Sequence, residues 1–424
     1  MSSSTDAQAE MRQARKIFNL VYREAFNPVF TSQVLRPVEW LLNHGENVWL
    51  GVFSTFGDLL RPRTRRRWHA LLNGAEHRVA ERVRRLPCRR HPRSPRWWDA
   101  TVLGAWLLAH HPHESIILHC RNELMTAVAL YLRQRLSSVR VILDYRGLSH
   151  AEFLLGQRSL ANPHTQARAQ KIYELERRVA QEADSVLCVS DRLASYVSND
   201  YGVPRERIHV VPCCVEARRF AQAVREREAT RSALGLGSRL TVVYCGSLQH
   251  WQRPETCAQV FRMTKMVVPS AHYLVLTTEP GKMADVAGRS GLNTASTTIL
   301  RADASEVPRY LAAADVGLLL RESCIVNEMS SPVKFGEYLA SGLPVIMNTG
   351  IGDYSELAAK EGVGVVLPND KPVETWIDPI VRFLEEYRRS QDELRRRCRE
   401  VAERQLSWDV HLPRVVDLYQ RLPT

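Results

Sequence analysis

The sequence has no long hydrophobic run. A helix that crosses a bilayer needs about 18 or more consecutive apolar residues, whereas Asp315 interrupts LAAADVGLLL and the run TVLGAWLLA is too short. The first residues, MSSSTDAQAEMRQARK, lack the apolar stretch of a secretory signal. We therefore expect a protein that neither spans a membrane nor is secreted.

Cysteine is present but unpatterned. The nine cysteines are odd in number and scattered, no two have the Cys-x-x-Cys spacing, and Cys213 and Cys214 are adjacent. This usage argues against a disulfide framework and against a zinc site, and it indicates a reducing compartment. No Asp-x-Asp pair or His/Cys cluster in the sequence suggests a metal site either. We therefore expect a cytoplasmic protein with no metal ion and no cofactor.

Lysine is scarce, with seven among the 58 basic residues. The formal net charge is +12, and residues 1–220 account for all of it with 33 basic and 21 acidic side chains, whereas residues 221–424 hold 25 of each. Most of the excess lies in residues 61–98, which carry thirteen arginines against two glutamates. A basic excess of this kind points to an anionic partner.

Large apolar side chains stand between the arginines of residues 61–98: Trp68, Leu71, Leu72, Trp97 and Trp98. This pattern predicts an amphipathic surface that rests on anionic lipid headgroups, aromatic side inward, on the inner face of the plasma membrane. Basic and aromatic residues together also suit nucleic acid, which is the less favoured partner. A solvated basic loop is the third interpretation.

Short apolar runs alternate with helical patterns such as 163–183 and 385–405. The runs lie at 16–22, 47–53, 115–119, 139–144, 185–190, 208–211, 240–245, 272–278, 297–300, 315–320, 343–348 and 363–367. Their continuous apolar character is typical of parallel strands that are covered on both faces. We predict an α/β protein with two Rossmann-like doubly wound domains, 1–212 and 213–406, that face each other across a cleft.

The stretch SSPVKFGEYLASGLPVI, residues 330–346, predicts a helix with an unusual start. Ser331 suits the N-cap and Pro332 the first helical position, which puts Lys334 and Glu337 one turn apart. The helix dipole disfavours a lysine there, so its presence suggests a bound anion such as phosphate. The alternative is a Lys–Glu pair on a solvated helix.

Two further strand exits carry glycine or serine. VVYCGSLQHWQRPE, residues 242–255, runs from a strand into Gly246 and Ser247, and Arg253 could fork onto two phosphate oxygens. NTGIGDYSEL, residues 348–357, also follows a strand. Each glycine could serve an ordinary turn, but three such exits in one domain predict a diphosphate site.

These motifs in combination resemble glycosyltransferase family 4, whose members have the GT-B fold and transfer sugars from nucleotide sugars. The resemblance rests on VYCGSLQHWQRPE, LAAADVGLLL and SSPVKFGEYLASGLPVI, with CVSDRLASYV and VVPCCVEARRF before them and SWDVHLPRVVDLYQRL at the end. It covers roughly 185–424 and is only architectural over 1–180. It implies that 213–406 is the donor domain, that 1–212 is the acceptor-side domain, and that the helix at 407–424 packs back on the latter.

The resemblance also implies residue roles. Glu337 matches a glutamate that binds the nucleotide ribose, whereas the family's first glutamate falls at Met329, next to Glu328, which could substitute for it. The family's loop arginine corresponds to Ser247 and its loop lysine to Arg253, so Lys334 would replace part of the missing charge. We expect Lys334, Arg253 and Glu337 to be catalytic. The expected donor-binding set is Gly246, Ser247, Glu328, Ser330, Ser331, Lys334 and Glu337.

The predicted reaction is retaining, metal-independent hexosyl transfer to a glycan or lipid-linked acceptor in bacterial surface polysaccharide synthesis. The resemblance implies the retention, and it implies that the leaving phosphate takes the proton of the acceptor hydroxyl. On the acceptor side, VRVILDYRGLSHAEF places Asp144, Arg146 and His150 at a strand exit, although Asp144 and Arg146 could equally form a structural ion pair. Two alternatives stay open: a silent GT-B scaffold, because of Met329 and Ser247, and a nucleotide-sugar epimerase.

Overall fold

The computed structural model describes residues 15–89, 97–110, 115–157 and 162–422. The expectation about a signal segment falls mainly on residues 1–14, outside the described residues, as do residues 90–96 of the arginine-rich segment. The chain divides into two compact units, one formed by Met1–Pro212 with His411–Thr424 and the other by Cys213–Val410. We describe each unit by itself.

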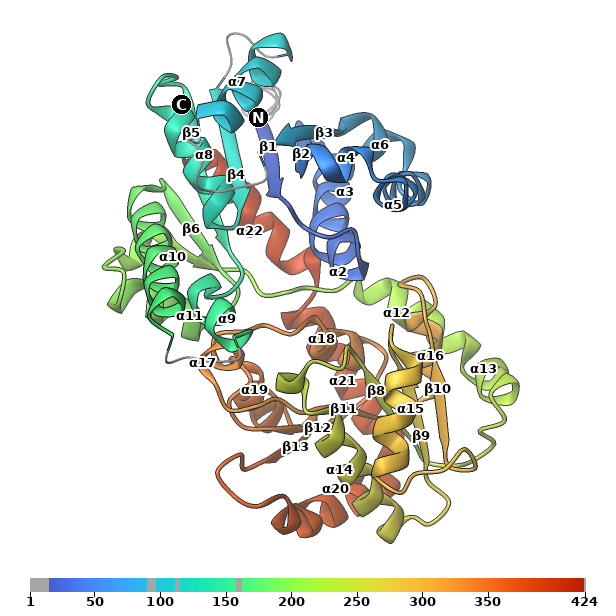
Figure 1. Cartoon of the computed structure of the whole chain (residues 1–424). Helices are drawn as coiled ribbons and strands as arrows, with labels where there is room; N and C mark the ends of the chain where they lie inside the picture. The colour runs from blue at the N-terminus through green and yellow to red at the C-terminus, as the bar shows by residue number, and fades with distance from the viewer. Residues whose placement is uncertain (1–14, 90–96, 111–114, 158–161, 423–424) are drawn as a thin grey trace, which may run out of the picture. The chain divides into compact units, whose positions relative to one another are not determined.

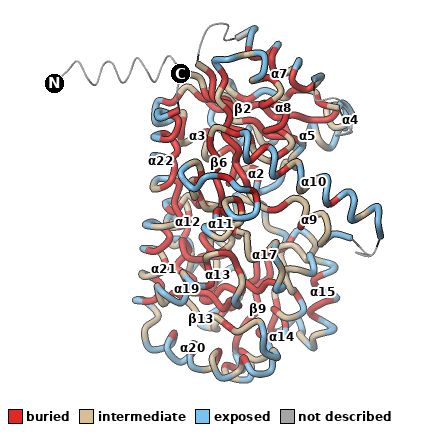
Figure 2. Tube along the Cα trace, turned by 90° about the vertical axis from the view of Figure 1, so that its left-hand side faces the viewer, coloured by how far each residue is buried: buried red, intermediate tan, exposed pale blue. Residues whose placement is uncertain are grey.

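The first unit is built on a seven-stranded parallel sheet (Figure 1). Its order is β3-β2-β1-β4-β5-β6-β7, so the chain starts in the middle and winds outward in both directions. The strands are β1 (Arg15–Tyr22), β2 (Val48–Thr55), β3 (Val83–Cys88), β4 (Ser115–Arg121), β5 (Val139–Tyr145), β6 (Ser185–Cys188) and β7 (Ile208–Val210). The strands labelled β2 and β6 are largely buried, as Figure 2 shows in red.

Polar side chains start several helices of this unit. Asn122 caps α8 by accepting from the Met125 N–H at 3.0 Å, and Ser190 caps α11 by accepting from the Leu193 N–H at 3.0 Å. The helices are α2 (Pro28–Phe30), the π-helix η1 (Thr31–Leu35), α3 (Arg36–Asn43), α4 (Phe56–Leu60), α5 (Pro62–Asn73), α6 (His77–Arg82), α7 (Trp97–His110), α8 (Glu123–Arg133), α9 (Ser149–Leu155), α10 (Pro163–Glu182), α11 (Asp191–Asn199), η2 (Arg205–Arg207) and the C-terminal α22 (Trp408–Arg421).

The second unit repeats the same winding with a six-stranded parallel sheet of order β10-β9-β8-β11-β12-β13. Its strands are β8 (Thr241–Cys245), β9 (His272–Leu276), β10 (Thr297–Leu300), β11 (Val316–Leu319), β12 (Val345–Asn348) and β13 (Gly364–Leu367). Its helices are α12 (Ala217–Ala223), η3 (Val224–Glu226), α13 (Arg227–Ala233), η4 (His250–Gln252), α14 (Pro254–Val267), α15 (Pro280–Arg289), α16 (Val307–Ala313), α17 (Ile325–Glu328), α18 (Val333–Ala340), α19 (Tyr354–Glu361), η5 (Val373–Trp376), α20 (Ile377–Arg389) and α21 (Gln391–Gln405).

Two apolar cores cover the two faces of this sheet. Val243 and Cys245 of β8 pack in one core with Phe335 of α18, whereas Val242 and Tyr244 pack in the other with residues of α14, α15 and α20. Successive side chains of β8 therefore enter opposite cores, as the pleat of a strand requires. Burial on both faces explains why the strands read as continuous apolar runs. The prediction of an α/β protein with two parallel sheets is confirmed.

Two local predictions differ from the structure. The edge strand β3 was missed because its sequence, VRRLPC, contains two arginines and a proline and buries only Val83, Leu86 and Cys88. The single helix expected at 385–405 is wrong, since Ser390 separates α20 from α21. Moreover, α21 is not simply solvated, because it buries Leu394, Cys398 and Val401 against the sheet.

Candidate functional site

The carboxyl ends of β8, β11 and β12 meet at one edge of the second unit's sheet. The strands are parallel, with Leu318 opposite Tyr244 and Leu319 opposite Met347, so that all three end at nearly the same level. The segments that leave them are 246–253, 320–332 and 349–353. Ligands of doubly wound sheets bind at this edge, and every donor-side residue predicted from the sequence lies on these segments or on α18.

Lys334 and Glu337 form an ion pair of 3.0 Å between Nζ and Oε2 on α18. Both side chains also lie close enough to the Cys245 thiol at the end of β8 to affect its titration. Burial acts to lower the pKa of Lys334, but the interactions with Cys245 and Glu337 outweigh it and raise that pKa above its usual value. Lys334 therefore keeps a positive charge directly beside the Gly246 turn.

The predicted start of α18 is wrong. The helix begins at Val333 with Pro332 at the cap position, and Ser331 lies outside it. The Ser331 hydroxyl accepts from the Cys213 N–H at 2.9 Å and lies 2.6 Å from the Tyr354 hydroxyl. Ser331 thus connects the segment at Cys213 and the helix α19 to the loop before α18, instead of capping α18.

The loop before α18 lies against the loop after β12. Gly352 has a φ of +47°, and a Cβ atom there would overlap the Ser330 carbonyl oxygen, so only glycine fits. The Ser330 hydroxyl donates to the Asn327 carbonyl at 2.8 Å. The half-buried Glu328 lies near Gly350, and within the described chain its carboxylate makes no hydrogen bond or ion pair with Lys334.

The turn after β8 is held by its own side chains. A Cβ on Gly246 would approach Gln252 Oε1 to 2.6 Å and Tyr244 Oη to 3.1 Å, which explains the glycine. The Gln252 amide donates to the Ser247 hydroxyl at 2.6 Å, and the Tyr244 hydroxyl donates to the Ser247 carbonyl. Ser247 therefore shapes the turn with both its side chain and its backbone.

We expected the Arg253 guanidinium to be free to bind two phosphate oxygens, but in the structure it has partners within the protein. Its φ is +50°, it donates to Asn369 Oδ1 at 2.8 Å, and its guanidinium lies 5.6 Å from the centre of the Trp376 ring. One of its donors is thereby occupied. Its role toward phosphate stays a prediction.

Arg321 is a residue of this edge that the sequence reasoning missed. It follows β11, is 9% exposed, and its backbone exchanges hydrogen bonds of 2.7 and 2.8 Å with the Asn348 side chain. Burial lowers the pKa of its guanidinium. An arginine directly after the apolar run LLL was the available signal, because such a side chain lies where that strand ends.

In the first unit, Asp144 is the centre of a buried charge cluster at the end of β5. Arg146 lies 2.8 Å from it, and Arg121 and His119 each lie 3.7 Å from it. Burial opposes ionisation, but Arg146, His119 and Arg121 together hold the pKa of Asp144 well below its usual range. The geometry therefore favours the structural ion pair that we considered for Asp144 and Arg146. His119 is also buried, and its Nδ1 lies 2.6 Å from the hydroxyl of Tyr419 on α22.

His150 belongs to a separate network around Glu176, a buried carboxylate that sequence reasoning also missed. His150 Nδ1 lies 2.6 Å from Glu176 Oε2, which also accepts from the Tyr201 hydroxyl at 3.2 Å. Nearby, Ser149 donates to Glu123 at 3.0 Å, and burial raises the pKa of Glu123 to about 7. Among the described residues, the ion pairs of His150 and of Asp144 therefore involve different partners.

Two further features are absent from the described residues, a metal-binding cluster and a membrane-spanning helix. No group of three or more His, Cys, Asp and Glu side chains in the described parts of the chain is arranged to hold a metal ion. Likewise, none of the helices within the described ranges has both the length and the apolar character needed to cross a bilayer.

Comparison with known structures identifies the fold as GT-B. The chain superposes on HepE of Anabaena in complex with UDP-glucose with a TM-score of 0.66 and 12% identity, covering 96% of this chain and 100% of that one. It superposes on a glycosyltransferase of Rickettsia africae ESF-5 with a TM-score of 0.66 and 11% identity, covering 96% and 98%. For starch synthase IV of Arabidopsis thaliana the TM-score is 0.58 at 12% identity, covering 96% and 99%.

Comparison of the sequence with known families and proteins gives matches to glycosyltransferases over part of the chain. The profile of the glycosyl transferase 4-like domain matches residues 34–214, so this part of the chain is such a domain. A stretch of 187 residues is 26% identical to the "Putative teichuronic acid biosynthesis glycosyltransferase TuaH" of Bacillus subtilis (strain 168), covering 44% of this chain and 45% of that relative. The chain thus matches less than half the length of this relative. The match agrees with the predicted family and lies in the first half of the chain, where only the architecture had suggested it.

Proposed function

We propose that this protein is a retaining glycosyltransferase that moves a hexosyl group from a nucleotide sugar to an acceptor. The observation that carries the proposal is the position of the Lys334–Glu337 pair beside Cys245, at the end of β8 and next to the Gly246 turn. This puts a cation, a carboxylate and a glycine turn at the sheet edge where doubly wound proteins bind nucleotides. The GT-B fold and the glycosyl transferase 4-like domain support the same reaction class.

Charge stabilisation at the leaving group is the chemistry that these residues can supply. When the glycosidic bond breaks, negative charge develops on the β-phosphate of the nucleoside diphosphate. The Lys334 ammonium would stabilise this charge more than it stabilises the intact donor, which lowers the barrier. The leaving phosphate would accept the proton of the acceptor hydroxyl, without a metal ion.

Glu337 would bind the ribose hydroxyls of the donor. It is an acceptor-only group when ionised, and Lys334 uses one of its oxygens at 3.0 Å. The same contact would hold the carboxylate in one orientation for the ribose. Ser330 and Glu328, on the loop before α18, would complete this side of the donor. In HepE the bound molecules are UDP, glucose and UDP-glucose, which makes a uridine donor the first choice for testing.

The acceptor would be a glycan or lipid-linked sugar of a bacterial surface polysaccharide. This follows the teichuronic acid biosynthesis role in the name of the Bacillus subtilis relative. Asp144, Arg146 and His150 would act on the acceptor side, with Asp144 serving mainly to fix Arg146. Such a reaction would take place in the cytoplasm at the inner face of the membrane.

Attachment to anionic lipid would use α5, in a way that differs from our expectation. Trp68 is 8% exposed, packs 5.2 Å from the Phe26 ring, and cannot face lipid. The arginines on the outer side of α5 are exposed, and the neighbouring α4 exposes Phe56 by 52% and Leu60 by 77%. Basic charge with two apolar side chains suits a headgroup surface.

A donor panel tests the proposed function. Purified protein is incubated with UDP-, GDP-, ADP- and dTDP-sugars, and release of nucleoside diphosphate is measured beside thermal stability. We expect one donor to raise the melting temperature and to be hydrolysed slowly without acceptor. Donor binding with no turnover would support the silent scaffold, and conversion of the sugar without nucleotide release would support the epimerase.

A further inference from the structure

Arg321 carries a charge that the protein itself does not neutralise. The residue is 9% exposed. Within the described ranges its guanidinium makes no hydrogen bond, ion pair or ring contact, and the hydrogen bonds of the residue all involve its backbone N–H and C=O. The groups close enough to affect its titration are the phenols of Tyr244 and Tyr338 and the thiol of Cys257, all neutral at pH 7.

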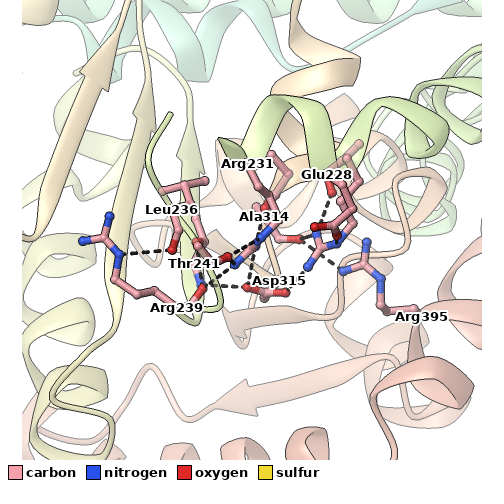
Figure 3. Close-up of polar contacts among 12 residues, drawn as sticks. Glu228, Arg231, Leu236, Arg239, Thr241, Ala314, Asp315 and Arg395 are labelled. Carbon is pink, nitrogen blue, oxygen red and sulfur yellow. Dashed lines mark hydrogen bonds and ion pairs between the residues drawn. The ribbon is translucent and has the colours of Figure 1, made fainter. Parts of the chain in front are cut away.

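Other buried arginines of the same unit have hydrogen-bond acceptors within the protein, as Figure 3 shows for the base of β11. Arg231 is 5% exposed and donates to Asp315 and to the carbonyls of Ala313, Gly237 and Arg239 at 2.7 to 3.3 Å. Arg395 is 6% exposed and donates to the Ala314 carbonyl at 3.1 Å. Burial of a guanidinium in this protein is therefore ordinarily accompanied by acceptors.

A buried cation without acceptors lowers the stability of a protein. Its desolvation is unfavourable, and neither an opposite charge nor hydrogen bonds offset that cost. Five N–H donors of a guanidinium remain for a ligand, in a planar arrangement that matches phosphate oxygens. An anionic ligand would supply the missing acceptors.

The position of Arg321 indicates which anion this is. The hydroxyl of Tyr244 donates to the Ser247 carbonyl, and the hydroxyl of Tyr338 accepts from the Cys245 N–H at 2.9 Å. The two phenols that influence Arg321 therefore lie directly under the Gly246 turn. Lys334 interacts with Cys245 at the same point, so that the turn has a lysine and an arginine beside it.

We propose that Arg321 binds the diphosphate of the nucleotide at the Gly246 turn and supplies the guanidinium that this turn lacks at Ser247. The inference rests on the proposed function for the identity of the ligand, but not for the presence of an anion site. Lys334 and Arg321 would hold the diphosphate from α18 and from β11. With one cation on α18 and the other directly after β11, the site would bind two linked phosphates, one at each cation, in preference to a single tetrahedral anion.

The test compares Arg321→Met with Arg231→Lys. Melting temperature and affinity are measured with inorganic pyrophosphate, UDP, GDP and ADP, and with sulfate at the same concentrations. Without ligand we expect Arg321→Met to melt at the same temperature as the wild type or higher, because an unpaired buried charge is removed. With ligand, its affinity for pyrophosphate and for the responding nucleotide should fall about tenfold or more, the loss of a charge-assisted contact. Arg321→Lys should recover part of this affinity.

Arg231→Lys is the matched control, since it alters an arginine whose acceptors are all within the protein. It should lower the melting temperature and leave the affinities unchanged.

The inference is overturned if Arg321→Met binds pyrophosphate and nucleotides as the wild type does, if sulfate gives the same Arg321-dependent shift, or if the wild type responds to none of them. Arg321-dependent pyrophosphate binding without consumption of any nucleotide sugar would uphold the site and refute the proposed function. Normal sugar transfer by Arg321→Met, with unchanged affinity for pyrophosphate and nucleotides, would uphold the proposed function and refute the Arg321 site.

Discussion

Lys334 Nζ and Glu337 Oε2 lie 3.0 Å apart on α18, with 23% and 12% of their side chains exposed. Lys282 and Glu279 form an ion pair of the same spacing at α15, but with 74% and 31% exposed. Exposed pairs of this kind contribute little to stability. The comparison separates a pair at a sheet edge, beside a buried thiol, from an ordinary surface pair.

Replacing Lys334 by alanine should reduce sugar transfer about 100-fold, because removing one group that stabilises developing charge has an effect of this size. Glu337→Ala should mainly raise the KM for the donor, since it removes a ribose contact. Lys282→Ala is the matched control and should change neither kcat nor KM. Near-normal rates in both α18 variants would refute the assignment of this edge as the donor site.

Gly352→Ala should destabilise the protein by about 3 kcal/mol or more, in the upper range of single substitutions. The new Cβ would overlap the Ser330 carbonyl oxygen at a φ of +47°. Gly237→Ala serves as the control, because Gly237 has a φ of +54° but no atom within 4 Å of the added Cβ. Its loss should be about 1–2 kcal/mol, the cost of the left-handed conformation alone. Urea unfolding of both variants measures the difference, and equal losses would show that the Gly352–Ser330 contact is not tight.

The positions of most strands follow from features that lie within short stretches of sequence. Each predicted apolar run overlaps a strand, because burial on both faces of a parallel sheet favours apolar residues at successive positions. The Lys334–Glu337 pair was equally accessible, since helical spacing alone places residues three apart on one face.

The features that could not be predicted from the sequence depend mostly on residues that are distant along the chain. Ser331 is not a cap because its hydroxyl meets the Cys213 N–H, 118 residues away in sequence. The importance of Arg321 comes from the acceptors that it lacks, a property of its surroundings and not of the motif. The strand β3 was hidden because an edge strand tolerates arginine and proline on its open side.

Glu123 should make stability depend on pH in an unusual direction. Burial raises its pKa to about 7, and Glu176, Ser149 and Glu152 lie close to it. The folded state therefore keeps its proton where the unfolded state has lost it, so that stability should fall as pH rises from about 4.5 to 7. Glu123→Gln should remove this slope and stabilise the protein at pH 8 by roughly 3 kcal/mol at most. The exposed Glu174→Gln on α10 is the control, and identical pH profiles for both variants would contradict the prediction.

Binding to anionic vesicles should depend on the exposed arginines of α5. Each basic side chain near an anionic surface contributes about 1 kcal/mol, so replacing Arg63, Arg65, Arg66 and Arg67 by glutamine should weaken binding to phosphatidylserine-containing vesicles at least about tenfold.

The control replaces four exposed arginines of the second unit, Arg388, Arg389, Arg396 and Arg404, by glutamine and changes the net charge equally. Phe56→Ser with Leu60→Ser should weaken binding further at high salt, where the electrostatic attraction is screened but the apolar contact persists. Equal losses for the two sets of arginines would show that net charge, and not the α4–α5 surface, governs the interaction.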